Sequence, residues 1–583
     1  MRCFSKIFNH IQRKLREPAP GNLLPVFAGF CRFPVNFFGV FLFGFLLFTS
    51  NVFAQSFSDS GSPQELAAAI ERAMTDDQAL GQLFMIAWGG EPPSDNLLEW
   101  IRQKNIGGVK IFGWNTNDTT SLARSIGALQ RISMQGPFGI PLLIATDQEG
   151  GWIRHVKGNT SETPGNMAIG ASGYPRDAYL SGYYIGKELA LLGINMNFAP
   201  TVDLFTNRAS AIIGPRSFGD DPVSAGILGS AFARGQLAAG VIPTAKHFPG
   251  HGDTALDSHG ILPRIEVPFN TLWERELIPY RMLVTEGLPA VMSAHLAFPL
   301  TPSGATPASL SAFFLREVLR ERIGFGGVVI TDDLNMIGAV SYLRNLPRTA
   351  RQAIEAGNDI IMFSSILPLY DSVWTYLVQS MREDEVFRRV VRSSVRRVLE
   401  LKLTYLRGPQ SVAHIPDPAR VASELPDPES SAFFLNLAAR SVTIVKPGSP
   451  NPVFPLPAQN AGRVLLAGRF ADFFTYGRAA FPNAAVFRFS GTTDPQTLVN
   501  QSRNADTIIF CLSDNADLRM LRSLQQSNRR VIVFSILSPV HIESVPWVTA
   551  AVAVYSYARE SFAAGFSVIT GRIPALGILP YEW

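Results

Sequence analysis

Eight short apolar runs alternate with helix-like segments between about residues 65 and 405 of this 583-residue chain, and this alternation constrains the fold more than any other feature. The runs cover residues 83–88, 107–112, 141–147, 195–203, 240–246, 290–295, 327–332 and 357–363. Their length and continuous apolar character are typical of strands buried on both faces. Eight such strands with helical crossovers predict a (β/α)₈ barrel of the α/β class, and a doubly wound open sheet is the main alternative on pattern alone.

Polar residues at the ends of these runs favour the barrel. Asp147, Asp203, Lys246, His295 and Asp332 end five consecutive runs. In a barrel these carboxyl ends converge on one face, where the βα loops form the active site. A single strand-ending aspartate is more often a turn residue, but five consecutive strands that end in reactive groups predict a site.

The chain after the barrel divides into a short linker and a second folded part. Residues 406–430 are rich in Pro, Asp, Ser and Ala, and we interpret them as a linker after a barrel domain at 55–405. Residues 431–583 alternate apolar runs at 463–467, 507–512, 531–535 and 550–555 with helical segments, which predicts a smaller α/β sandwich. Cys511 and His541 in this part are expected to be structural.

The N-terminal 54 residues have the order of a secretory signal. Six basic residues and one acidic residue precede the apolar segment 37–48, which is followed by Val52, Phe53 and Ala54. We expect cleavage after Ala54 and export to the periplasm or cell envelope, with a membrane association only if the signal stays uncleaved. Cleavage would remove two of the three cysteines, leave Cys511 alone, and rule out an intrachain disulfide.

The formal charge of +4, from 51 Lys and Arg against 47 Asp and Glu, belongs to the same segment. The segment carries six basic residues and one acidic residue, so the remaining chain has 45 against 46 and a net charge of −1. The basic balance therefore does not predict a nucleic-acid partner. We expect a monomer.

A loop rich in histidine follows the fifth run. Residues 246–259 read KHFPGHGDTALDSH, and the glycines and proline exclude a regular helix. Such a loop could bind a metal, as His and carboxylate groups commonly do. It could instead carry a general acid/base in which Asp257 orients His259, or it could be a structural loop held by its own hydrogen bonds. The residue types alone leave these three interpretations open.

Two further segments carry candidate groups. Asp332 leaves the seventh run next to Asp333, so one aspartate can cap the next helix while the other acts as a nucleophile in the pocket. Asp147 begins the segment DQEGG, whose polar groups beside flexible glycines suit a polyhydroxylated ligand or a simple turn. Arg216 lies in the loop after the fourth run and by itself indicates only a surface or ion-pair residue.

These segments together resemble the family 3 glycoside hydrolases, specifically the exo-acting β-N-acetylglucosaminidases. The resemblance covers most of residues 65–365, and the segment 246–259 is its most specific part. It implies that Asp332 is a nucleophile forming a covalent glycosyl-enzyme, with His259 as acid/base paired with Asp257 on a mobile loop. The residues it implies for holding N-acetylglucosamine (GlcNAc) are Asp147, Arg216, Lys246 and His247. It implies no metal and no other cofactor.

One segment departs from the pattern of the family. Related enzymes carry arginines shortly after the double glycine, whereas this chain has Trp152, Ile153, Arg154 and His155. Arg154 can substitute as a substrate-binding residue, or Trp152 can stack on the ligand. The departure concerns the shape of the sugar pocket and the preference for the leaving group.

The resemblance implies a retaining exo-β-N-acetylglucosaminidase acting on peptidoglycan fragments or related glycans. A GlcNAc phosphorylase of the same family is a close alternative, because a histidine acid/base does not repel phosphate as a glutamate would. A non-catalytic glycan-binding envelope protein and a metallohydrolase are the alternatives from other classes.

Overall fold

The computed structural model of the protein describes residues 55–583, apart from residue 366 and residues 449–450. The predicted signal segment, with Cys3 and Cys31, lies outside the described residues. The described residues belong to one compact unit. None of the helices among the described residues is long and apolar enough to cross a bilayer.

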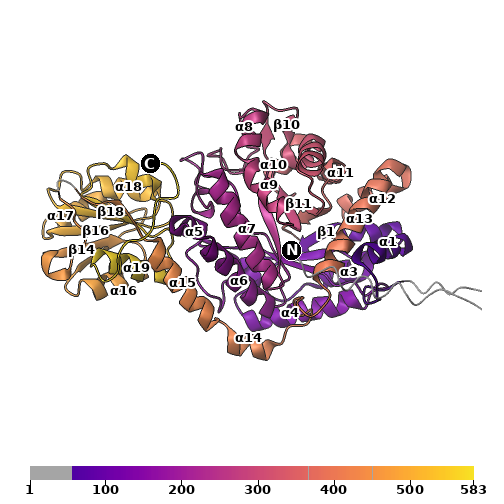
Figure 1. The fold of residues 1–583 in the computed structure, drawn as a ribbon, viewed down its shortest axis with the longest axis horizontal. Coiled ribbons are helices and arrows are strands. Elements are labelled where there is room, and N and C mark those ends of the chain that lie inside the picture. The colour runs from indigo at the N-terminus through magenta and orange to yellow at the C-terminus, as the bar shows by residue number, and fades with distance from the viewer. Residues whose placement is uncertain (1–54, 366, 449–450) are drawn as a thin grey trace, which may run out of the picture. The chain divides into compact units, whose positions relative to one another are not determined.

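Eight parallel strands close into a barrel, as the sequence predicts (Figure 1). In chain order they are β1 (Phe84–Ala87), β2 (Gly108–Ile111), β3 (Leu143–Thr146), β6 (Met196–Asn197), β7 (Ile242–Phe248), β8 (Ala290–Ser293), β11 (Val328–Asp333) and β12 (Ile360–Phe363). Each lies within or overlaps one of the eight apolar runs. Their order around the barrel is β1-β12-β11-β8-β7-β6-β3-β2, so β3 stands four strands from β11 in either direction. The carboxyl ends of β3 and β11 therefore face each other across the barrel.

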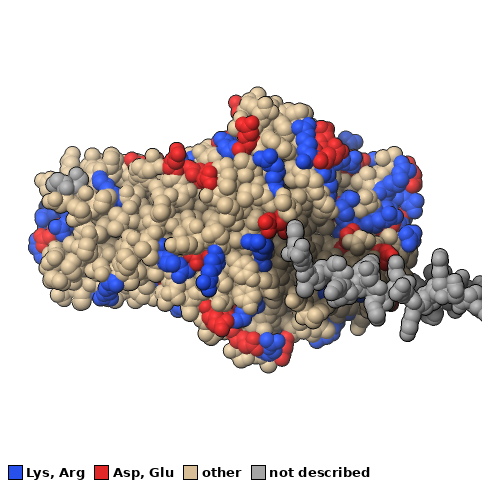
Figure 2. Space-filling model, in the orientation of Figure 1, with Lys and Arg blue, Asp and Glu red and all other residues tan. Residues whose placement is uncertain are grey.

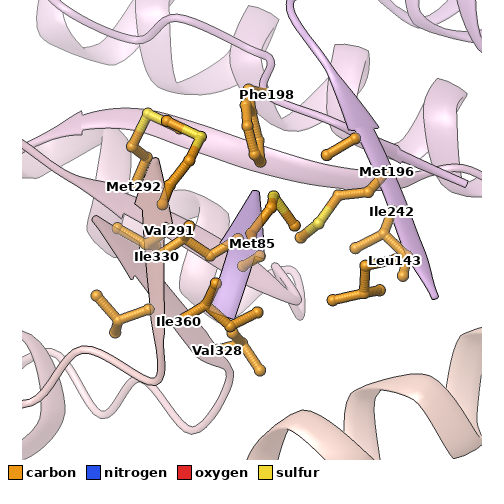
Figure 3. Packing of buried hydrophobic residues seen from close by; sticks show 14 of the residues in the cluster. Met85, Leu143, Met196, Phe198, Ile242, Val291, Met292, Val328, Ile330 and Ile360 are labelled. Carbon is orange, nitrogen blue, oxygen red and sulfur yellow. The ribbon is translucent and has the colours of Figure 1, made fainter. Parts of the chain in front are cut away.

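Apolar side chains fill the barrel interior. Met85, Leu143, Met196, Ile242 and Ile360 are fully or almost fully buried and pack together in the centre of the barrel (Figure 3). Such a packed interior leaves no channel through the sheet. Any ligand site must therefore form above the packed layers, where the strands end in polar groups.

Helices surround the barrel and connect its strands. They are α1 (Pro63–Ala73), α2 (Asp76–Gly81), α3 (Asp95–Lys104), α4 (Thr119–Met134), α5 (Asn166–Ser172), α6 (Pro175–Leu191), α7 (Pro222–Ala238), α8 (Phe269–Glu274), α9 (Leu277–Thr285), the π-helix Phe313–Arg322, α10 (Ile337–Leu343), α11 (Leu346–Ala356), α12 (Ser372–Glu383) and α13 (Glu385–Tyr405). Two short hairpins extend the loops, β4 (Gln148–Gly150) with β5 (Ile153–Arg154) and β9 (Ala297–Phe298) with β10 (Gly304–Pro307).

The segment 406–430, predicted as a linker, contains a helix and the start of another. Asp417 caps α14 (Pro418–Glu424) and Asp427 caps α15 (Pro428–Ser441), each by accepting a backbone N–H of the first turn. In both helices proline occupies the first position, where its missing N–H is not needed. The two Asp-Pro pairs therefore mark helix starts, although the composition of the segment resembles a linker.

The C-terminal part is a six-stranded sheet between helices. Its order is β13-β18-β17-β16-β14-β15, with β13 antiparallel to β18 and the other pairs parallel. The bounds are β13 (Thr443–Lys446), β14 (Val464–Gly468), β15 (Ala485–Arg488), β16 (Thr507–Leu512), β17 (Arg530–Ser535) and β18 (Ala550–Ala553), with α16 (Ala471–Ala480), α17 (Pro495–Ser502), α18 (Asn515–Arg522) and α19 (Arg559–Ile569). Alternate residues enter separate cores, Leu466 and Ile509 on one face and Leu465 and Ile508 on the other. This α/β sandwich agrees with the fold class predicted from the sequence.

The face seen in Figure 2 is largely uncharged, and its charged side chains gather in separate groups. Lys and Arg lie close to Asp and Glu over the barrel, and no extended area of a single sign is visible there. Further charged side chains, among them the buried Lys246 and Arg216, lie inside the barrel mouth.

Candidate active site

A cavity of about 330 Å³ opens at the carboxyl end of the barrel. Among its lining residues are Lys110, Asp147, Glu149, His155, Arg216, Lys246, His247, Asp257, His259, Asp332 and Asp333. Of the eight residues predicted to act in catalysis or substrate binding, seven line this cavity and Arg154 does not. They come from strands or loops far apart in the sequence, and the barrel brings them together because its strand ends share one face.

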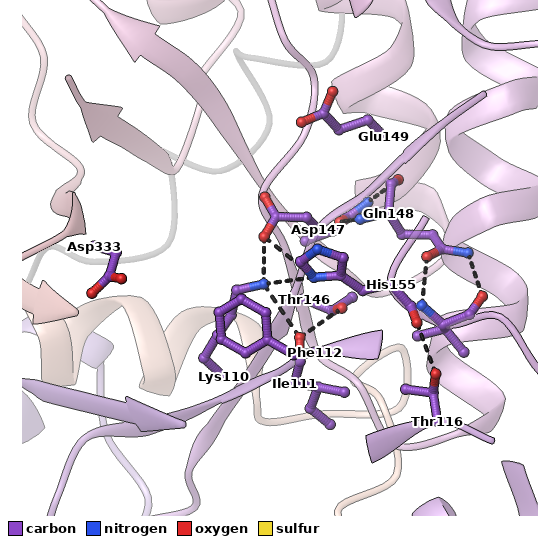
Figure 4. Close-up of polar contacts among 12 residues, drawn as sticks. Lys110, Ile111, Phe112, Thr116, Thr146, Asp147, Gln148, Glu149, His155 and Asp333 are labelled. Atoms are coloured by element: carbon purple, nitrogen blue, oxygen red, sulfur yellow. Dashed lines mark hydrogen bonds and ion pairs between the residues drawn. The ribbon is translucent and has the colours of Figure 1, made fainter. Parts of the chain in front are cut away.

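Asp147, directly after β3, lies between two lysines. Its carboxylate contacts the ammonium group of Lys110 from β2 (Figure 4). It also contacts the ammonium group of Lys246 from β7. Burial alone would raise the pKa of Asp147, but the two lysines outweigh this effect and lower it well below its ordinary value. Asp147 therefore presents a fixed carboxylate, which can accept hydrogen bonds from sugar hydroxyls.

A buried ion pair supports the same wall. The Arg216 guanidinium binds Glu149 through two bonds, Nε to Oε2 at 2.9 Å and Nη2 to Oε1 at 2.8 Å. Lys246 lies 2.6 Å from Oε1 of the same carboxylate. Burial raises the pKa of Glu149, but the two cations outweigh it and lower the pKa to about 2. Glu149 thus holds Arg216 in place. The sequence shows Glu149 only as part of the polar segment DQEGG and does not predict this role.

His247 is fixed on both sides of its ring. Its Nδ1 lies 2.6 Å from Oδ2 of Asp203, and Arg216 Nη2 lies 3.2 Å from its Nε2. Because a guanidinium only donates, Nε2 accepts and Nδ1–H donates to Asp203 in the neutral ring. Asp203 also accepts the backbone N–H groups of His247 and His251, at 3.2 and 2.7 Å. Asp203 therefore anchors the loop and is not exposed to a ligand.

Asp332, near the end of β11, has a carboxylate with few partners. One oxygen accepts the backbone N–H of Asp333 at 2.8 Å, and no other side chain in the described structure bonds to it. Burial raises the pKa of Asp332, but His247, His295 and Lys246 together with this N–H outweigh it and lower the pKa. The group is thus ionised at neutral pH and faces the cavity, as a nucleophile requires.

The next helix, α10, has Met336 at its N-cap with no side-chain hydrogen bond, so the expected capping by an aspartate of the doublet does not occur and Asp333 has a different role. Its Oδ1 accepts the N–H groups of Asn335 and Ser364, at 3.0 and 2.9 Å. It therefore fixes the turn after β11, and Asp332 is left free for the cavity.

His259 and Asp257 form a pair on the loop between β7 and α8. Asp257 Oδ1 lies 2.6 Å from His259 Nδ1 and accepts the His259 backbone N–H at 3.0 Å. The two side chains are 68% and 48% exposed, unlike the rest of the site. Burial raises the pKa of Asp257, but these contacts with His259 outweigh it and lower the pKa. Both residues line the cavity and are among its more exposed residues.

Trp152 and Arg154 do not line this cavity. They line another one, of about 260 Å³, together with Tyr557 and its neighbours in the C-terminal part. The Arg154 guanidinium contacts the carbonyl of Ser161 at 3.5 Å and the carboxylate of Glu162 at 3.7 Å. The expected substrate-binding role of Arg154 is therefore not supported by its position. Successive residues of a strand point to opposite sides. Ile153, the first residue of β5, and His155, the residue after β5, face the barrel cavity, so Arg154 between them faces away from it.

Sequence reasoning missed Lys110 and His155 as site residues. Lys110 lies in the apolar run 107–112 and its side chain is only 1% exposed. A single charge inside a strand buried on both faces costs free energy unless it is paired. The lysine in this apolar run therefore indicates a buried charged partner. His155 follows Arg154 and was recognised only as part of the departure from the family pattern.

Comparison with known proteins places the chain in a family. The model of the glycosyl hydrolase family 3 N-terminal domain matches residues 75–401, more than half of the chain. The chain is 31% identical to a β-hexosaminidase A of Pseudoalteromonas piscicida over 418 residues, 65% of this chain and 69% of that protein. It is 35% identical to a β-hexosaminidase of Tolumonas auensis over 286 residues, 48% of this chain and 82% of that protein.

A solved structure agrees in fold over most of the chain. It is a family 3 β-N-acetylglucosaminidase from Paenibacillus, 28% identical in sequence, with a TM-score of 0.80 over 87% of this chain and all but 1% of that one. The barrel fold and the cavity agree with the sequence relationship. The chain belongs to glycosyl hydrolase family 3 and is a glycoside hydrolase.

Proposed function

We propose that the protein is a retaining exo-β-N-acetylglucosaminidase that removes terminal β-linked GlcNAc from peptidoglycan fragments or related glycans. One observation carries the proposal: the free carboxylate of Asp332 shares a cavity with the pair of His259 and Asp257. Retaining hydrolysis needs a nucleophile for the anomeric carbon and a second group that first donates and then accepts a proton. Asp332 and His259 are of the right chemical types for these two tasks.

In the first step Asp332 attacks the anomeric carbon and the bond to the leaving oxygen breaks. His259 protonates that oxygen from Nε2, because Nδ1 faces Asp257. In the second step Nε2 takes a proton from water, the water oxygen attacks the anomeric carbon, and the bond to Asp332 breaks. Asp257 stabilises the imidazolium, so His259 can return to its starting state.

The choice of GlcNAc rests on the relatives, which are named β-hexosaminidases and a β-N-acetylglucosaminidase. The exo mode is supported by the charged residues that line the cavity. Lys246 and Arg216 are buried and Asp147 is partly buried there, which suits the free hydroxyls of a chain end. Peptidoglycan as the source agrees with the predicted export signal, and cell fractionation with N-terminal sequencing of the mature protein would test that location.

Product analysis tests the proposal. Defined muropeptides and chitooligosaccharides would be digested with and without phosphate, and the products identified by mass spectrometry. We expect free β-GlcNAc from the non-reducing end in both buffers, and equal rates with and without EDTA. GlcNAc-1-phosphate as the main product in phosphate would instead establish a phosphorylase, and activity lost in EDTA and restored by zinc would establish a metallohydrolase.

A further inference from the structure

Lys110 is a buried lysine whose three donors are all used within the protein. Its Nζ contacts the Asp147 carboxylate, the carbonyl of Ile111 at 3.3 Å and Nδ1 of His155 at 3.2 Å (Figure 4). An ammonium has three N–H donors and no acceptor, so none remains for a ligand. Lys110 therefore acts on the groups around it and does not itself bind the sugar.

The contact with Lys110 decides which nitrogen of His155 carries the proton. The ammonium only donates, and the Asp147 carboxylate lies farther from this nitrogen, with Oδ2 at 3.6 Å. Nδ1 of His155 therefore accepts from Lys110, and the neutral ring carries its hydrogen on Nε2. Burial, together with the charges of Lys110 and Lys246, lowers the pKa of His155 to about 4, against the opposing effect of Asp147. The ring is thus neutral at neutral pH and in one tautomer.

The free nitrogen of His155 is available to a ligand. His155 lines the active-site cavity with a side chain 27% exposed, and nothing in the described part of the chain bonds to Nε2. The ring also packs against Phe112, with 5.1 Å between ring centroids, and Phe112 stacks on Trp114 at 4.5 Å. The ring is therefore held between Lys110 and an aromatic wall, with one N–H donor left unused.

The position of His155 indicates which end of the sugar it meets. Asp147 follows β3, and β3 lies opposite β11 in the barrel, so the wall of Lys110, Asp147 and His155 is across the cavity from Asp332. In a pyranose ring the anomeric carbon and C4 are at opposite ends. A sugar whose anomeric carbon meets Asp332 has its non-reducing end, with the hydroxyls on C4 and C6, at this wall.

We propose that His155 is a specificity-determining residue that donates its Nε2–H to the C4 or C6 hydroxyl oxygen of the sugar, with Lys110 as the positioning residue that fixes its tautomer. The proposal rests on the proposed function, because it takes Asp332 as the group that meets the anomeric carbon.

Two substitutions of His155 separate the donor from the rest of the side chain. Asn places its polar atom near the position of Nδ1, so H155N can still accept from Lys110 but has no donor towards the cavity. Gln reaches the position of Nε2 with a donor, so H155Q is the matched control. With an aryl β-GlcNAc we expect kcat/KM to fall about 10- to 100-fold in H155N and less than about 5-fold in H155Q, the scale of one buried hydrogen bond.

Deoxy sugars then identify the partner. The 3-deoxy, 4-deoxy and 6-deoxy aryl β-GlcNAc substrates would be compared in the wild type and in H155N. We expect the ratio of kcat/KM between the wild type and H155N to fall below about 3-fold for either the 4-deoxy or the 6-deoxy substrate. The 3-deoxy substrate should keep the same ratio as the parent sugar. An equal loss on all three substrates, or no loss in H155N on the parent sugar, would overturn the proposal.

The role of Lys110 has a readout that needs no substrate. Nitrogen-15 NMR of the histidine side chains, assigned with H155Q, reports which ring nitrogen is protonated. We expect protonation at Nε2 in the wild type, and in K110M a mixture of tautomers with a His155 pKa raised from about 4 towards its ordinary value. K110R tests rescue by another donor. K402M removes a lysine buried elsewhere, bonded only to Gln82, and should change neither the His155 signals nor kcat/KM.

The two arms distinguish the two proposals. A wild type that does not release GlcNAc from the aryl substrate defeats the proposed function, and the NMR arm still decides the tautomer. A wild type that is active, with protonation at Nδ1 of His155, defeats the further inference alone.

Discussion

Asp257 binds His259 twice through one carboxylate oxygen, at 2.6 Å from Nδ1 and at 3.0 Å from the backbone nitrogen of the same residue. Because Asp257 and His259 are only two residues apart, these two contacts fix the imidazole ring of His259 relative to its own backbone. The ring is otherwise exposed, so this carboxylate supplies most of its orientation.

Removal of the His259 imidazole should affect substrates according to their leaving groups. General acid catalysis contributes about 10²- to 10⁴-fold when the leaving oxygen is basic, and little when it leaves readily as an anion. We expect H259A to lose that factor in kcat/KM on chitobiose and much less on a dinitrophenyl β-GlcNAc. D257N should show the same trend with smaller losses. Equal losses on both substrates, measured under the same conditions, would show that His259 is not the acid.

The charged wall should contribute to stability as well as to binding. E149Q removes the carboxylate that is paired with Arg216 and Lys246, both of them buried. Breaking a buried pair by removing one partner costs about 3–5 kcal/mol, because a buried charge is left uncompensated. The control is E424Q, which breaks an exposed pair with Arg420 on α14 and should cost less than about 1 kcal/mol. Urea unfolding of both variants would be compared, and similar losses would contradict the assignment.

Acid should destabilise the protein in a window set by two histidines. Burial lowers the pKa of His155 and of His251 to about 4, and the charge of Lys110 contributes to the lowering at His155. The ordinary histidine value is about 6.5, so between pH 6.5 and 4 the unfolded chain binds protons that the folded chain does not. The free energy of unfolding should therefore fall as the pH falls through this window.

Urea midpoints between pH 7.5 and 4.5 measure this dependence. H251Q removes one of the two histidines, so the urea midpoint should depend less steeply on pH than in the wild type. A wild-type stability that is constant between pH 7 and 5, or a variant with the same slope as the wild type, would contradict the burial of these rings as neutral groups.

Asp147, just before the β4–β5 hairpin, and Arg154, in its second strand, should differ in their effect on turnover. Asp147 faces the barrel cavity, and we expect D147N to lower kcat/KM about 10²-fold or more, because a fixed charged acceptor is lost. Arg154 faces the other cavity, and R154M should stay within about 3-fold of the wild type on an aryl β-GlcNAc. The reverse order of effects would show that the hairpin turns its other side to the sugar.

The sequence predicted the barrel because its strands are buried on both faces and therefore read as continuous apolar runs. It missed β13 and β15, which are the edge strands of the C-terminal sheet and are partly exposed, so their runs are short and mixed. The composition around the Asp-Pro pairs at 417–418 and 427–428 predicted a linker, whereas each pair marks the start of a helix.

The site shows the same division. Residues at strand ends, such as Asp147, Lys246 and Asp332, could be predicted because the barrel brings all strand ends to one face. The direction of Arg154 could not, because it depends on the alternation within a strand of two residues. The role of Lys110 also required the structure, since its three partners come from different elements.

Covalent trapping tests the central claim most directly. The protein would be incubated with a fluorinated GlcNAc analogue that forms the glycosyl-enzyme faster than it is hydrolysed, then digested and analysed by mass spectrometry. We predict one glycosyl group per chain, on the peptide that contains Asp332, and no label or turnover in D332A. Labelling of another carboxylate, or turnover in D332A equal to that of the wild type, would contradict the account.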